Sequence, residues 1–220
     1  TCFLENAQID QPGRCTSAQL GEMYAYGHDM SHHTFAGSKT SGYVNATDWP
    51  TSLSIAEDVR AQWAGLRTRG WTRGIGFACW GYAYTFESTQ TAARQQLVRD
   101  GLRAGGVVAM RKSSPYNGES KYLLPAARMP VDPLVLSGAI QVTNTHTAQD
   151  VMTAIDEAEA TGQWAIITLH RAVADENTPG SLEMTASNMA TWMAYLKARI
   201  DAGGIRCAPF GETYSALYED

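Results

Sequence analysis

The sequence has no long apolar run, no basic segment and no closely paired cysteines. Its apolar stretches fall short of the roughly 18 consecutive residues that a membrane-spanning helix needs. With 17 basic and 22 acidic residues the net charge is −5, so the chain offers no basic field for nucleic-acid phosphates. The four cysteines form no C-x-x-C motif, which disfavours a zinc knuckle and leaves the compartment open. We therefore expect no nucleic-acid partner and no membrane span.

The chain is long enough for one sizeable core. It has 220 residues, of which 44% are hydrophobic and 18% are charged, and such a composition argues against disorder. We expect a single domain over residues 1–220. The first residue is Thr1 and the chain opens on an expected strand. This favours a mature form or a piece of a larger polypeptide. No signal in the sequence fixes the compartment, and we expect a secreted, cell-surface or virion-associated location rather than a cytoplasmic one.

An amphipathic stretch that ends near a glycine and leads into a short apolar run recurs five times. Alternating helices and uniformly apolar strands are typical of a parallel sheet covered by helices, so the predicted fold class is α/β. Ser54 and Glu57 have the spacing of a capping box, and residues 112–137 are predicted to be a long excursion. The predicted helices cover residues 16–26, 54–69, 88–104, 147–161 and 185–202, with a short one after Pro209; the predicted strands cover 1–4, 28–30, 74–78, 107–110, 164–169 and 205–208.

Histidines and aromatic residues follow three of these strands. His32 and His33 come after the second strand, Trp80 and Tyr82 after the third, and His170 after the strand at 164–169. Active sites of parallel α/β sheets form at the carboxyl ends of the strands, where the loops converge. Because three of the five histidines fall there, the pattern favours a functional site over scattered structural histidines.

Several segments resemble, in order, the motifs of the NodB-type polysaccharide deacetylases, carbohydrate esterase family four. Residues 24–37, Tyr-Ala-Tyr-Gly-His-Asp-Met-Ser-His-His-Thr-Phe-Ala-Gly, resemble the motif that carries a metal-binding His. Residues 76–82, Gly-Phe-Ala-Cys-Trp-Gly-Tyr, resemble the aromatic strand end, and residues 166–170, Ile-Ile-Thr-Leu-His, resemble the strand that ends in a catalytic His. Residues 1–4 are similar to the strand before the first of these motifs, and residues 203–212 to the closing strand with its Glu.

The resemblance implies a distorted (β/α) barrel that removes acetyl groups from a polysaccharide or glycan with a divalent metal, zinc above others. It implies His33 as a metal ligand and His170 as the general acid. His32 is a further candidate ligand if the loop turns it inward. Trp80 and Tyr82 could stack on sugar rings or simply pack at the barrel rim, and Arg111 could reach the substrate from a neighbouring loop.

Two departures from the family pattern leave alternatives open. The family's aspartate strand, which supplies the base, would lie upstream of Thr1, and Gly37 stands where a second ligand His is expected. A degenerate, non-catalytic carbohydrate-binding domain of a larger surface or phage tail protein is the alternative. A hydrolase that uses Cys79 with His170 lacks a nucleophile-elbow motif. His28 is predicted to pack near the bottom of the sheet and His146 to be solvated.

Asp175 and Glu176, in the loop after His170, are candidates for a replacement carboxylate, although surface charges are the commoner role for such residues.

Overall fold

The chain divides into two compact units in the computed structural model, which describes residues 1–33, 43, 46–79, 91–111, 132–136 and 140–218. Unit 1 contains residues 1–112, 131–136 and 209–220, and unit 2 contains residues 113–130 and 137–208. Each unit has its own helices and parallel strands. Within the described residues, no helix has the length and apolar character needed to cross a membrane.

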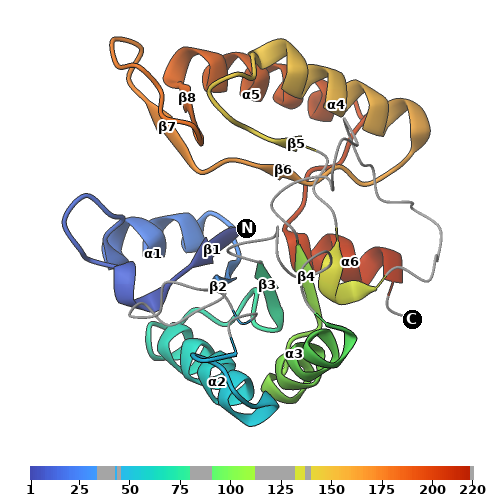
Figure 1. The fold of residues 1–220 in the computed structure, drawn as a ribbon. Coiled ribbons are helices and arrows are strands. Elements are labelled where there is room, and N and C mark those ends of the chain that lie inside the picture. Colours follow the sequence, from blue (N-terminus) through green and yellow to red (C-terminus); the bar gives the residue numbers. More distant parts are fainter. Residues whose placement is uncertain (34–42, 44–45, 80–90, 112–131, 137–139, 219–220) are drawn as a thin grey trace. The chain divides into compact units, whose positions relative to one another are not determined.

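Unit 1 is built on a four-stranded parallel sheet in the order β1-β2-β3-β4 (Figure 1). Successive strands are joined through α1, α2 and α3, so the predicted α/β class is confirmed. The strands are β1 (Cys2–Leu4), β2 (Met30–His33), β3 (Phe77–Cys79) and β4 (Ala109–Arg111); the helices are α1 (Ser17–Ala25), α2 (Ser52–Thr68), α3 (Ala92–Gly105) and α6 (Phe210–Tyr218), with short 3-10 turns η1 (Asn6–Gln8) and η3 (Pro133–Val135).

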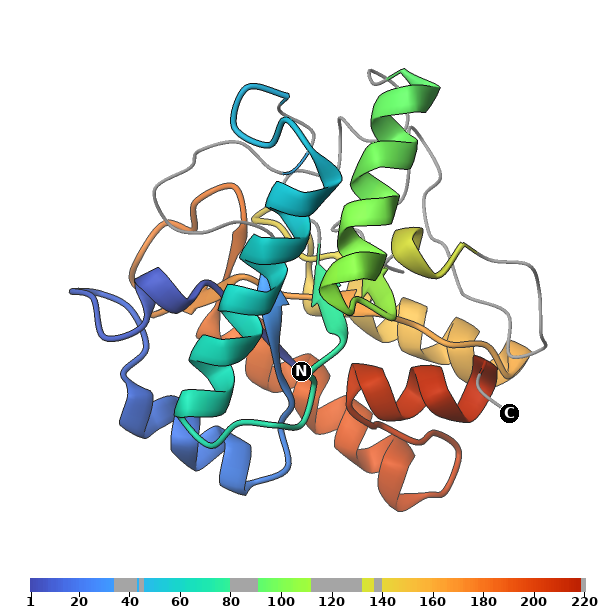
Figure 2. The same cartoon turned by 90° about the horizontal axis from the view of Figure 1, so that it is seen from below.

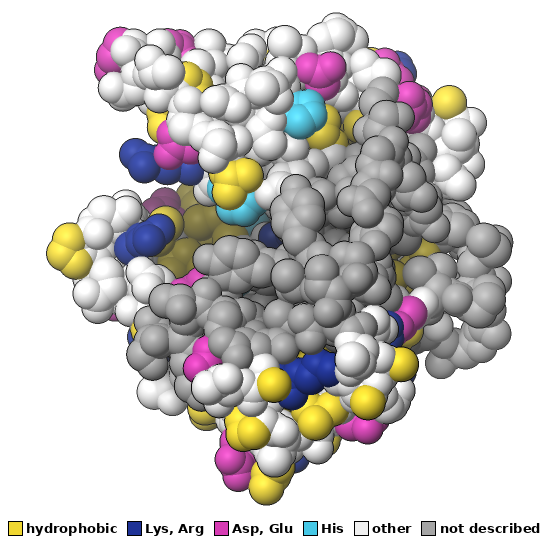
Figure 3. Space-filling model, viewed as in Figure 1, with side chains coloured by type: hydrophobic (Ala, Val, Ile, Leu, Met, Phe, Trp, Pro, Cys, Tyr) yellow, Lys and Arg dark blue, Asp and Glu magenta, His cyan; other side chains and the backbone are white. Residues whose placement is uncertain are grey.

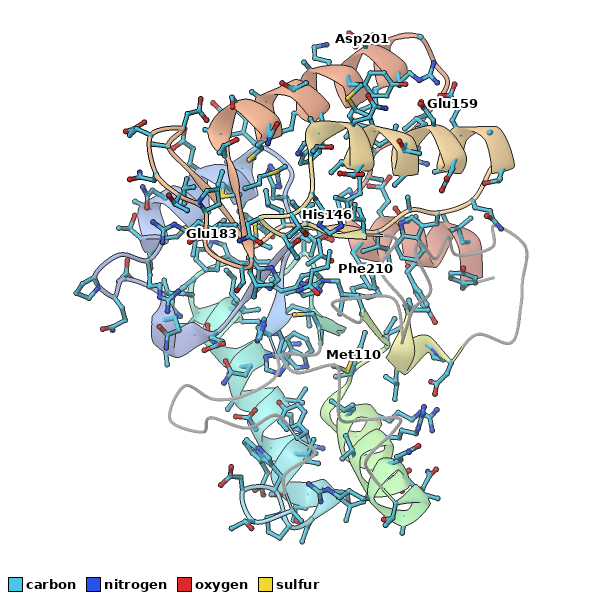
Figure 4. All side chains as sticks on the ribbon, turned by 45° about the horizontal axis from the view of Figure 1, so that its top comes forward. Met110, His146, Glu159, Glu183, Asp201 and Phe210 are labelled. Carbon is cyan, nitrogen blue, oxygen red and sulfur yellow. The ribbon has the colours of Figure 1, made fainter. Side chains whose placement is uncertain are left out.

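The two faces of this sheet carry different side chains, because successive strand residues point to opposite sides. Register places Leu4, His32, Ala78 and Met110 in one row. Met110, labelled in Figure 4, belongs to the core cluster that also contains residues of α1, α2 and α3. The opposite face carries aromatic rings: Phe210 of α6 makes edge contacts with Phe3 and Phe77.

Two glycines let α3 pack closely on α2; the two helices lie side by side in Figures 1 and 2. A Cβ at Gly105 would lie 2.7 Å from Val59, and one at Gly101 would lie 2.7 Å from both Ile55 and the carbonyl oxygen of Ser52. The spacing of four residues puts both glycines on one face of α3. The close packing of α2 and α3 therefore depends on the absence of a side chain at both glycines.

A threonine is the N-cap residue, directly before the first helical residue, of each of the helices α1 to α5. The side chain of each accepts a hydrogen bond from a backbone N–H in the first turn and thereby satisfies one of the free donors of the helix end. The prediction that Ser54 and Glu57 cap the second helix was wrong. Ser54 is instead the third helical residue of α2, and it forms the capping box with Thr51. The capping residues are Thr16, Thr51, Thr91, Thr147 and Thr185.

Unit 2 packs α4 (Ala148–Thr161) and α5 (Ala186–Asp201) around a second core. Two short parallel pairs accompany them, β5 (Ile140–Gln141) with β6 (Ile167–Thr168), and β7 (Arg171–Val173) with β8 (Glu183–Thr185). The core side chains include Val142, Val151, Ile155, Met184 and Trp192. Figure 4 labels Glu159 on α4, Asp201 at the end of α5 and Glu183 on β8.

The predicted strands differ from the observed ones in position and number. The strand predicted at 74–78 lies at Phe77–Cys79, the one predicted at 164–169 is limited to Ile167–Thr168, and β5, β7 and β8 were not predicted. The second strand covers Met30–His33 rather than 28–30, so both of its histidines lie within the sheet. His28 is exposed rather than packed. Residues 205–208 form no strand; Arg206 and Cys207 are exposed. An apolar residue after a helix-ending glycine does not make a strand unless a neighbouring strand offers its backbone groups as hydrogen-bonding partners.

Candidate active site

Four polar side chains come from the carboxyl ends of the four strands of unit 1. Glu5 follows β1 directly, whereas His33, Cys79 and Arg111 are the last residues of β2, β3 and β4. His33 is in register with Cys79, and Cys79 with Arg111, so these three lie on the same face of the sheet. Neighbouring strands are about 4.8 Å apart, so this row spans about 10 Å. We call these four residues the edge cluster.

The Glu5 carboxylate and the His33 imidazole form a direct pair, with 3.4 Å between Glu5 Oε1 and His33 Nδ1. Their side chains are 21% and 24% exposed, so both reach solvent from a partly buried position. Burial raises the pKa of Glu5, and Arg14 opposes that shift through its positive charge. A carboxylate with a raised pKa is a better proton acceptor than a fully solvated one, so the pair has the composition of a general base with an adjacent imidazole.

Cys79 and Arg111 extend the edge cluster with a neutral thiol and a cation. Burial raises the pKa of the Cys79 thiol to about 11, although the charge of Arg111 opposes the shift. The thiol is therefore protonated at neutral pH, which makes it a poor nucleophile. Arg111 is 9% exposed, and its guanidinium carbon lies 4.6 Å from the centroid of the Phe3 ring. This stacking holds a positive charge at the end of β4.

His32 faces the opposite side of the sheet and is fully buried. Its Nε2 lies 2.9 Å from the Tyr43 hydroxyl, which donates a 2.6 Å hydrogen bond to Asp58 Oδ2. Trp63 of α2 packs against the imidazole edge to face. Burial lowers the pKa of His32 to about 3, so the ring is neutral at ordinary pH. The structure therefore separates His32 from His33, although the two are adjacent in sequence.

The remaining predicted catalytic residue, His170, belongs to unit 2. It is exposed and lies between β6 and β7. His146, labelled in Figure 4, follows β5, and its Nδ1 is 2.7 Å from the Thr143 hydroxyl. His146 lies in the loop before α4, as predicted, but it is half-buried rather than fully solvated, and the Thr143 N–H also contacts its Nδ1, at 3.2 Å. Asp175 accepts a hydrogen bond from the Ser187 N–H in the first turn of α5, which gives it a structural role.

Trp80 and Tyr82, the two predicted sugar-stacking residues, lie outside the described residues. Gly37, where the family resemblance expects a second ligand histidine, lies outside them as well. On the face seen in Figure 3, acidic and basic side chains of the described residues are interspersed and form no continuous field of one sign.

The edge cluster contributes two side chains suited to a divalent metal, the Glu5 carboxylate and the His33 imidazole. A catalytic zinc site normally has three protein ligands. Within the described part of the chain, no group of three or more His, Cys, Asp or Glu residues is arranged to hold a metal ion. The described residues alone therefore do not fit a resident metal, and we derive no reaction step through one.

Glu5 was missed by the sequence reasoning. The predicted site residues all followed later strands, and none followed the strand at 1–4. The signal was nevertheless present, since Glu5 is the first carboxylate after an apolar strand at the start of a parallel α/β pattern. The sequence carries no comparable signal for Tyr43 and Asp58, because their hydrogen-bonded network with His32 depends on the packing of α2 against β2.

Comparison of the chain with known protein families, with curated proteins and with solved structures found no match in any of the three.

Proposed function

We propose that the chain is a hydrolase that removes acetyl groups from a polysaccharide or glycan, with Glu5 as its general base. The observation that carries the proposal is the Glu5–His33 pair at the carboxyl edge of a parallel sheet. The similarity of residues 24–37 and 166–170 to the motifs of the polysaccharide deacetylases supports the choice of substrate and reaction. In this proposal Glu5 supplies the carboxylate that the resemblance places upstream of Thr1.

The strand order supports a barrel of the deacetylase type as the overall fold. Right-handed crossovers between adjacent parallel strands place the connecting helices on the same side of the sheet. The sequential order β1-β2-β3-β4 has this property, and α1, α2 and α3 contribute to a single core cluster. A doubly wound sheet instead reverses its strand order, which the four strands of this sheet do not do, although α6 packs against the face opposite to α1, α2 and α3. We therefore propose a distorted (β/α) barrel, of which the sheet of unit 1 is one arc.

The proposed reaction begins when the Glu5 carboxylate accepts a proton from a water molecule, whose oxygen attacks the acetyl carbonyl carbon. His33, 3.4 Å from Glu5, orients the carboxylate. The carbonyl oxygen becomes negatively charged, and Arg111 stabilises that charge. Acetate is released as the departing sugar nitrogen or oxygen takes up a proton, and the protonated Glu5 is the donor that unit 1 itself contains. The sequence resemblance assigns this proton to His170 of unit 2.

Acetate release from a panel of N- and O-acetylated glycans tests this function, together with metal analysis of the same preparation. We expect acetate from at least one glycan, and a loss of about 10²-fold or more in Glu5→Gln and His170→Ala. Glu57→Gln is the matched control, because Glu57 is exposed on α2. Absence of acetate release across the panel, or full activity in Glu5→Gln, would contradict the proposal.

A non-catalytic carbohydrate-binding domain is the second candidate. The observation that favours it is that, among the described residues, no three His, Cys, Asp or Glu side chains are arranged to hold a metal ion. This candidate predicts glycan binding without acetate release and with no tightly held metal. Calorimetric titration with the same glycans distinguishes it from the hydrolase, because a hydrolase would consume the acetylated ligand during the measurement.

A further inference from the structure

Two buried polar residues of α2 are linked by hydrogen bonds to the residues that adjoin Glu5 and His33 in the chain. Asp58 is 8% exposed and Gln62 is 6% exposed, and their spacing of four residues puts them on one face of the helix. Gln62 binds Asn6, which follows Glu5 in the chain. A buried polar group is costly unless it is hydrogen-bonded, so two of them on one helix face call for an explanation.

Asn6 is held on α2 by hydrogen bonds and by shape. Its Nδ2 donates to the backbone oxygen of Gln62 at 2.8 Å and to Gln62 Oε1 at 2.9 Å, and its backbone N–H donates to the same Oε1 at 3.4 Å. The Asn6 side chain occupies the space beside Gly65, where a Cβ would lie 2.5 Å from Nδ2. Any side chain at position 65 would displace Asn6.

His33 has a matching support on the α2 side of the sheet. Asp58 accepts from Tyr43, and Tyr43 in turn contacts Nε2 of His32, the residue before His33. The peptide bonds that join His32 to His33 and Glu5 to Asn6 are planar, so fixing one residue restricts the direction of its neighbour. Glu5 and His33 thus each adjoin a residue that is linked by hydrogen bonds to α2. The two residues of α2 involved, Asp58 and Gln62, lie one helical turn apart.

We propose that α2 positions the Glu5–His33 pair from the opposite face of the sheet, with Asn6 and Gln62 as positioning residues for Glu5. The proposal rests on the proposed function in that Glu5 is taken as the base. A displacement of about 1 Å in a catalytic group can cost about 10²-fold in rate, which is the size of effect that such a support prevents. His32, Tyr43 and Asp58 support His33 in the same way.

The first test needs no substrate. Gly65→Ala removes no polar group but places a methyl group where Asn6 lies, and Asn6→Ala removes the contact without a clash. We expect both variants to keep their circular dichroism spectra and to lose the Glu5–His33 contact, measured as nuclear Overhauser effects between the Glu5 and His33 side chains. Gly21→Ala in α1 is the matched control, because a Cβ there meets no atom within 4 Å. Persistence of the contact in Asn6→Ala would overturn the inference.

The second test uses acetate release. If Asn6 acts through Glu5, Asn6→Ala lowers kcat about 10- to 100-fold and leaves KM nearly unchanged. The same substitution has no further effect on the residual rate of Glu5→Gln. Gln8→Ala, in the same turn η1, is the control variant. If Asn6→Ala lowered the residual rate of Glu5→Gln by the same factor as it lowers the wild-type rate, Asn6 would not act through Glu5 and the inference would be overturned. A wild-type chain without activity would contradict the proposed function alone, because the Overhauser measurement still decides the inference.

Discussion

The Tyr43 hydroxyl donates its proton to Asp58 at 2.6 Å and therefore meets His32 Nε2, 2.9 Å away, as an acceptor. A hydroxyl has only one proton to donate, so the His32 N–H must lie on Nε2. Nδ1 then has a free lone pair, and it has no hydrogen-bond partner among the described residues. The network of Asp58, Tyr43 and His32 thus fixes one tautomer of a neutral, buried imidazole.

This burial predicts a loss of stability in acid. The pKa of His32 falls from 6.5 to about 3 on folding. Between these values the unfolded chain binds a proton that the folded chain does not, so the free energy of unfolding decreases as the pH falls, by about 1.4 kcal/mol per pH unit. Between pH 7.5 and pH 4.5 the wild type should lose about 2–3 kcal/mol more than His32→Gln, as measured by urea denaturation.

Glutamine is the informative replacement, because it keeps an N–H donor for Tyr43 but does not titrate. Glu5, with its raised pKa, contributes in the opposite direction, since its stabilising contribution is present at low pH and is lost as the pH rises. That contribution is common to both proteins and cancels in the difference. Parallel pH profiles for the two proteins would show that His32 is not buried as described.

Removing the Tyr43 hydroxyl should destabilise unit 1. Tyr43→Phe leaves the N–H of His32 and a carboxylate oxygen of Asp58 without this partner, and such buried groups cost about 1–3 kcal/mol each. Tyr26→Phe is the matched control, because Tyr26 is 80% exposed. Thermal denaturation at pH 7.5 compares the two. Equal transition temperatures would mean that the buried network contributes nothing to stability.

The contact between α2 and α3 should reject a methyl group. Gly105→Ala places a Cβ 2.7 Å from Val59, and overpacking of this kind costs about 1–3 kcal/mol. The same change at Gly21, where a Cβ would meet no atom within 4 Å beyond its chain neighbours and the backbone of its own helix, should stabilise by up to about 1 kcal/mol through helix propensity. Urea denaturation of the two variants should therefore give shifts of opposite sign. A stabilising effect at Gly105 would show that the helices are not in close contact there.

Cys79 should resist alkylation. With a pKa of about 11, only about one thiol in a thousand is ionised at pH 8, and the thiolate is the form that reacts. Cys15 and Cys207 are exposed and should react with iodoacetamide at least about 100-fold faster. Peptide mass spectrometry over a time course measures the three rates. Rapid labelling of Cys79 in the folded protein would revive it as a nucleophile candidate.

The pH dependence of hydrolysis should show Glu5 as a base. Only the ionised carboxylate accepts a proton, so kcat/KM should rise with pH through the pKa of Glu5, which burial holds above its ordinary value of 4.5. In Glu5→Gln this acid limb should disappear along with most of the rate. An unchanged limb in the residual activity of the variant would assign the titration to another group.

The sequence predicted the α/β class, α1, α4, α5 and the order of helices and strands in unit 1. Apolar periodicity and helix-ending glycines are local signals, and Gly162 indeed ends α4 in the left-handed conformation. The pattern placed His33 near the carboxyl end of the second strand, but in the loop after it rather than as its last residue. The strand at 205–208 was wrong, because strand formation requires a partner that local sequence does not specify.

The sequence by itself therefore determined which residues alternate between helix and strand, and that histidines gather after strands. Only the tertiary structure decided that Glu5 meets His33, that His32 faces α2 instead, and that Asp58 and Gln62 support the two strand ends from behind. These contacts join residues 11 to 56 positions apart, or depend on which face of a strand a side chain takes. A one-residue change in register moves every side chain to the other face, so the packing of the whole sheet has to settle them.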